Sequence, residues 1–62
     1  MQSIKKYESV IGSINPTNSW EKFVKKVCII NLNDAKRTGS EANKIAYLSE
    51  IDFYLREIGI EA

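Results

Sequence analysis

The sequence predicts an all-α fold, either a small three-helix bundle or an intertwined helical dimer, as one domain over residues 1–62. Apolar residues recur at three- and four-residue spacing in three separate segments, the pattern of amphipathic helices. Short stretches with capping or helix-ending residues separate the segments. The composition, 44% hydrophobic and 27% charged with one proline, is that of a folded chain. We expect helices over about 3–14, 19–37 and 40–58.

The first helix is predicted from an apolar stripe whose opposite side is polar. Ser3 is a plausible N-cap, and Asn15 precedes Pro16. The residue before a proline is pushed out of helical geometry, so the helix should end there. The stripe consists of Ile4, Tyr7, Val10, Ile11 and Ile14.

The second helix is predicted to begin at a capping box formed by Asn18 and Glu21. Its apolar face should comprise Trp20, Phe23, Val24, Val27, Asn31 and Ala35, and its basic face Lys22, Lys25, Lys26, Asn33, Lys36 and Arg37. Cys28 borders the apolar face, where a buried thiol acts as an inert small hydrophobe. A short strand over 27–32 is the rival interpretation, because that run is rich in β-branched residues. A lone strand would have no pairing partner, which favours the helix.

The third helix shows the clearest periodicity. Its cap should be Thr38 with Glu41, or Ser40 alone. At its end, Gly59 and Ile60 match the Schellman motif, in which Ile60 contacts Leu55. The apolar stripe consists of Tyr47, Leu48, Ile51, Tyr54, Leu55 and Ile58.

The length of the chain indicates a need for a partner. A 62-residue chain buries only about 60% of the surface that its unfolded form exposes. A single cysteine excludes an internal disulfide, and the absence of histidine argues against structural zinc. Self-association or a protein partner is therefore expected. Phe53 and Ile29 fall outside the predicted core, so the candidate protein-binding residues are Phe53, Ile29, Tyr47 and Tyr54.

The residues needed for catalysis are missing from the sequence. Without histidine, Cys-His and Ser-His arrangements are impossible, and the three glycines form no phosphate-binding loop. We therefore expect no enzyme, no cofactor and no metal. The longest apolar run covers only residues 27–30, far short of the ~20 residues of a membrane span. A lone thiol without a secretion signal fits a cytoplasmic protein.

The leading hypothesis is a small regulatory or adaptor protein that binds another protein, as a homodimer; nucleic-acid binding is the alternative. Residues 1–38 carry seven basic and three acidic side chains, and residues 39–62 carry two and five. Ala35, Gly39 and Ile45 match a degenerate helix-turn-helix spacing, but acidic sequence follows and would repel phosphate. We expect instead that the lysines solvate the helix and pair with the acidic third helix of a neighbour. The nucleic-acid candidates are Lys22, Lys25, Lys26, Lys36 and Arg37.

Overall fold

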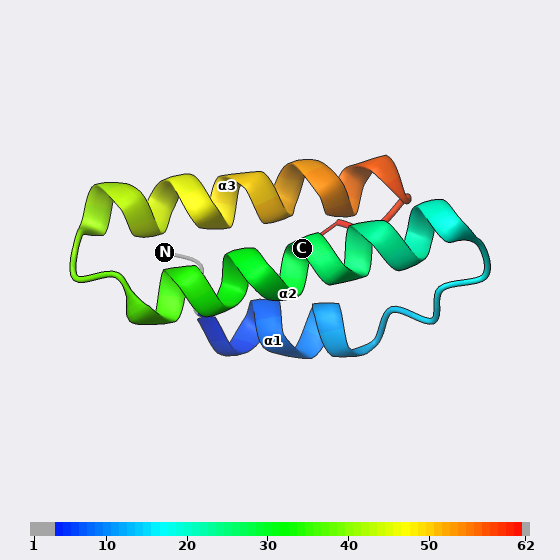
Figure 1. Cartoon of the computed structure of the whole chain (residues 1–62), viewed down its shortest axis with the longest axis horizontal. Helices are drawn as coiled ribbons and strands as arrows, with labels where there is room; N and C mark the ends of the chain where they lie inside the picture. The colour runs from blue at the N-terminus through cyan, green and yellow to red at the C-terminus, as the bar shows by residue number, and fades with distance from the viewer. Residues whose placement is uncertain (1–3, 62) are drawn as a thin grey trace.

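The computed structural model describes residues 4–61 and contains three helices, α1 (Ile4–Gly12), α2 (Ser19–Arg37) and α3 (Glu41–Glu57). The helices α2 and α3 run antiparallel as a long hairpin, and α1 packs against α2 (Figure 1). Within these residues there is no strand, which confirms the predicted all-α bundle. The strand alternative is wrong, because residues 27–32 lie inside α2. The proposed Ser3 cap lies outside the described residues.

The predicted cap of α2 forms, but only half of the capping box is present. The Asn18 side-chain oxygen accepts from the backbone N–H of Glu21 at 2.8 Å. The Glu21 carboxylate accepts from the backbone N–H and the hydroxyl of Thr17, both at 2.9 Å, rather than from Asn18. These two hydrogen bonds lower the pKa of Glu21 below its ordinary value. The carboxylate thus reaches one residue further back than the motif requires.

The ends of α3 follow the sequence prediction closely. Of the alternatives, Ser40 caps the start, its hydroxyl accepting from the Asn43 backbone N–H at 3.2 Å. At the other end, the Ile60 N–H donates to the Leu55 carbonyl at 2.9 Å, and the Gly59 N–H donates to the Arg56 carbonyl at 3.0 Å. Gly59 has a φ of +81°, the left-handed conformation that this motif places on glycine.

The core lies along the middle helix, where side chains of all three helices meet. Its members are Tyr7, Ile11, Ile14, Val24, Cys28, Leu32, Ala35, Leu48, Ile51 and Leu55. The buried face of α2 differs from the predicted one, since Cys28 and Leu32 are buried while Trp20 and Phe23 are exposed. The reason is that α1 packs on the side of α2 that carries Cys28 and Leu32, which shifts the covered arc toward it.

Three side-chain contacts attach α1 and the segment that follows it to the hairpin. The Tyr7 hydroxyl donates to both carboxylate oxygens of Asp52 in α3, at 3.0 and 3.1 Å. The Lys25 ammonium donates to the Ile14 carbonyl at 2.9 Å, and Lys36 pairs with Glu8. The predicted basic face of α2 therefore needs a correction. Lys25 and Lys36 do not project freely away from the bundle, because α1 lies beside them.

Candidate protein-binding surface

Four aromatic side chains form a continuous chain of rings across one end of the hairpin. Trp20 and Phe23 stack with centroids 5.7 Å apart, and Phe23 meets the edge of Tyr54 at 6.3 Å. Tyr54 in turn meets Phe53 at 5.3 Å in a T-shaped pair. Two rings come from the start of α2 and two from the end of α3. We call these four residues the aromatic surface.

The aromatic surface is open to solvent although its members contact one another. Trp20, Phe23 and Phe53 are 46%, 48% and 52% exposed, and Tyr54 is half-buried against the core. Single exposed apolar residues are common, but contiguous apolar patches mark sites of interaction. Aromatic residues are also enriched among those that dominate binding energy. This clustering, rather than any one exposed ring, makes the surface a candidate binding site.

The apolar character of this face continues along the hairpin. Ile30 lies two helical turns beyond Phe23 on the same row of α2, and Tyr47 lies two turns before Tyr54 on α3. Phe23 contacts Tyr54 and the two helices are antiparallel. Ile30 and Tyr47 therefore lie at the same position along the axis of the hairpin. Ile30 is 51% exposed and Tyr47 is half-buried. The face therefore extends for several turns.

This face is the side of the hairpin that α1 does not cover. On α2, Lys36 pairs with Glu8 of α1 and Lys25 donates to Ile14 just after α1, and both lysines lie on the opposite side of the buried row from Phe23 and Ile30. On α3, the contact with α1 is Asp52. A hairpin of two helices has two long seams between its helices. Here α1 covers part of one seam, and aromatic and aliphatic side chains lie along the other.

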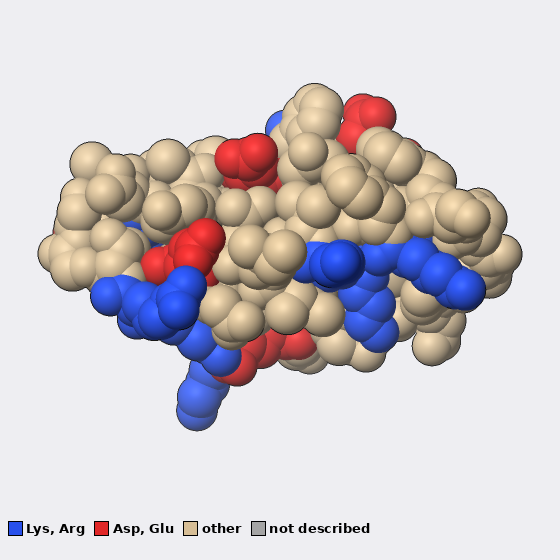
Figure 2. Space-filling view, viewed as in Figure 1, with Lys and Arg blue, Asp and Glu red and all other residues tan. Residues whose placement is uncertain are grey.

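The open seam is flanked by charges of opposite sign. Lys26 lies between Phe23 and Ile30 on the outer side of α2, and Glu50 lies between Tyr47 and Tyr54 on the outer side of α3. Glu57 follows Tyr54 one turn later on the same rim. Figure 2 shows basic side chains in groups along α2, with an acidic patch among them at one end, and acidic side chains at the edge over α3.

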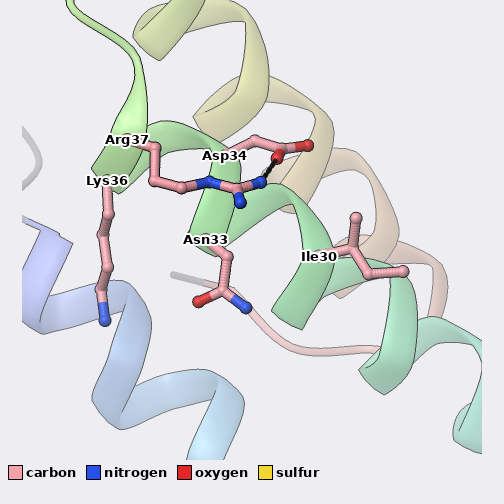
Figure 3. Close-up of a pocket in the computed structure, with 5 residues that line it drawn as sticks. All are labelled: Ile30, Asn33, Asp34, Lys36 and Arg37. Carbon is pink, nitrogen blue, oxygen red and sulfur yellow. Dashed lines mark hydrogen bonds and ion pairs between the residues drawn. The ribbon is translucent and has the colours of Figure 1, made fainter.

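A second region, the outer face of α2, holds two shallow depressions. One, of about 290 Å³, has Ile29 and Ile30 as its apolar part and Lys22, Lys25 and Lys26 around them. The other, of about 310 Å³, is lined by Ile30, Asn33, Asp34, Lys36 and Arg37. Figure 3 shows Arg37 lying across to Asp34, with a nitrogen–oxygen distance of 2.6 Å, while Lys36 points toward α1. Both depressions are open to solvent rather than enclosed.

The structure divides the residues predicted to bind protein between these two regions. Phe53 and Tyr54 belong to the aromatic surface, and Tyr47 lies further along the same seam. Ile29, 42% exposed as expected, lies on the outer face of α2 instead. Trp20 and Phe23 were assigned to the core and were therefore missed. The matching seven-residue spacings, Phe23 to Ile30 and Tyr47 to Tyr54, are the signal that could have revealed the second apolar seam.

The two groups with strongly raised pKa values both lie in the core. Burial raises the pKa of the Cys28 thiol to about 11, which leaves it protonated and unreactive at neutral pH. Burial, together with the hydrogen bond to Asp52 and its charge, raises the pKa of Tyr7 to about 12. Among residues 4–61 no cluster of potential metal ligands occurs, and no helix there is long and apolar enough to cross a bilayer.

The residues with helix-turn-helix spacing do not form a helix-turn-helix motif. In that motif two helices cross at about 90–120°, whereas α2 and α3 lie side by side in opposite directions (Figure 1). Ile45, which should be buried between the helices, is 61% exposed. The nucleic-acid hypothesis then rests on the basic side chains alone, of which Lys25, Lys36 and Arg37 have partners within the chain.

Comparison with protein-family models, curated proteins and solved structures finds no match for this chain. What it does is therefore inferred from the geometry of its own surface.

Proposed function

We propose that this chain is a small helical regulatory or adaptor protein that acts by protein–protein binding, as a homodimer, and not by catalysis. The observation that carries the proposal is the four-ring aromatic surface, three of whose members are about half exposed. A reducing cytoplasm is the compartment we expect, because the only thiol is buried and unpaired.

The energetics support binding through this surface. Aromatic side chains bury about 150–250 Å² each and dominate the energetics of interfaces. Tyr54 already packs on the core, so its ring is held in place before any partner arrives. A rigid ring loses less conformational entropy on binding than a flexible side chain does. The surface is thus preorganised.

The proposal is tested with two variants of the purified chain. Phe23→Ser with Phe53→Ser removes two rings of the aromatic surface, and Ile45→Ser removes an equally exposed apolar side chain elsewhere on α3. Light scattering measures self-association, and affinity capture from the native host measures other partners. We expect the double variant to lose self-association and the capture of other partners, and the Ile45→Ser control to keep these two activities.

The result that would contradict the proposal is unchanged association in the double variant. Nucleic-acid binding would take its place if the chain bound mixed DNA or RNA at about 150 mM salt, with affinity falling steeply as salt rises. Reversing Lys22 and Lys26 to glutamate should then abolish that binding. These two lysines are chosen because Lys25 and Lys36 also hold α1.

A further inference from the structure

We propose that the open seam is covered by the same seam of a second copy, the two copies being related by a two-fold axis parallel to the helices. This inference rests on the proposed function and specifies its partner. In the assembly, α2 of one copy lies over α3 of the other. The result is an antiparallel four-helix bundle with one α1 on each outer side.

The open seam has the size and composition of a dimer interface. A standard interface buries about 800 Å² on each partner, and the molecule, measuring 34 × 18 × 16 Å, offers a long side of that order. Trp20, Phe23, Ile30 and Tyr54 form an uncharged centre, with charged residues on the flanking rims and Asp34 one turn beyond Ile30. A centre depleted of charge within a polar rim is the usual anatomy of an interface.

The rims determine how two copies can face one another. Along the open seam, the α2 rim is basic at Lys26 and the α3 rim is acidic at Glu50 and Glu57. A two-fold axis across the helices would set basic rim against basic rim and acidic rim against acidic rim. An axis along the helices sets each basic rim against the partner's acidic rim. Like charges facing each other cost several kcal/mol, so the second arrangement is the one we infer.

Lys26 and Glu50 have opposite charges and also lie at nearly the same position along the helix axes. The contact between Phe23 and Tyr54 sets the level of the two helices. Lys26 lies three residues after Phe23 on α2, and Glu50 lies four residues before Tyr54 on α3. Their levels differ by one residue, roughly 1.5 Å. An axis along the helices preserves height, so Lys26 of each copy meets Glu50 of the other, twice per dimer.

The test is charge reversal within one chain and between chains. Lys26→Glu and Glu50→Lys should each raise the Kd of the dimer by at least about tenfold, because both pairs become like-charged. Mixing the two single variants should restore a mixed dimer, in which both pairs are again opposite in charge. Native mass spectrometry with one chain labelled with ¹⁵N identifies that species. Lys5→Glu, the same charge change on α1, is the control and should dimerise normally.

The outcomes separate this inference from the proposed function. A mixed dimer that forms while each single variant stays monomeric establishes the inferred pairing. Two results overturn the inferred pairing. One is that the mixture fails to associate, and the other is that Lys26→Glu raises the Kd of the dimer no more than Lys5→Glu does. A wild-type chain that is monomeric up to about 1 mM, the limit of weak affinity, also overturns it. Binding of a different protein that depends on Phe23 and Phe53 would then leave the protein-binding part of the proposed function standing, without its homodimer.

Discussion

The two seams of the α2–α3 hairpin differ in how they are covered. On one side, α1 contributes Tyr7 and Ile11 and the segment after it contributes Ile14, all at most 4% exposed. On the other side, Phe23 and Ile30 are about half exposed although their neighbours Tyr54 and Tyr47 pack on the core. Both seams are apolar, but only one is sealed within the chain.

Both seams have apolar side chains of the kind that form a core, and they differ in how much the described residues cover them. α1 has nine residues and covers part of one seam. Nothing further in residues 4–61 lies over the other. Small domains commonly obtain missing burial by association. The open seam is then one half of a shared core. Substitutions on each seam test whether the two seams differ in burial as described.

The largest effect should come from the covered seam. Ile11→Ala removes a fully buried side chain and leaves a cavity, and such changes cost about 2–5 kcal/mol. That is comparable with the whole stability of a small domain, about 5 kcal/mol. Urea unfolding followed by circular dichroism should show a largely unfolded variant. Ile45→Ala, on an exposed side chain, is the control and should be nearly neutral; equal losses for both would mean that α1 is not part of the core.

A smaller effect should come from raising the pH, again through the covered seam. Tyr7 keeps its proton to about pH 12 in the fold, whereas the unfolded chain releases it near pH 10. The folded state therefore binds more protons between these values, and stability falls as pH rises from 10 to 12, by up to about 2 kcal/mol. Other tyrosines titrate nearby, so Tyr7→Phe is the comparison. This variant should lose much of that dependence; an unchanged slope would contradict the raised pKa of Tyr7, whose main cause is burial.

The smallest effect on monomer stability should come from the aromatic surface. Phe53→Ser removes a ring that is about half exposed in the single chain, so the free energy of unfolding should change by less than about 1 kcal/mol. Thermal melts at concentrations below dimer formation test this. At high concentration the same variant should melt below the wild type, because it cannot gain stability by mass action. A loss as large as that of Ile11→Ala would make Phe53 a core residue.

Local signals predicted the helices well because they act within a few residues. The Asn18 and Ser40 caps and the Gly59–Ile60 stop depend on nearest neighbours and appear as expected. The exposure of Phe53 also followed from the helical repeat. These features require no knowledge of how the helices pack.

The buried face of α2 could not be placed by the same means. Its apolar arc runs from Phe23 through Val24 and Cys28 to Leu32, wider than one neighbour can cover. Which part of the arc is buried depends on where α1 and α3 pack against α2. The periodicity of the sequence does not determine this tertiary packing. Lys25 and Lys36 were assigned to a free basic face for the same reason. The polar contacts of α1 then gave them structural roles.

The most direct test uses Trp20, the only tryptophan in the chain, which lies on the open seam and is 46% exposed in the single chain. Its fluorescence should be red-shifted and readily quenched by acrylamide at nanomolar concentration. As association proceeds with rising concentration, the emission should shift to the blue and quenching should fall, in step with the mass from light scattering. Association without any change at Trp20 would show that the chains meet elsewhere and would contradict a shared core at the open seam.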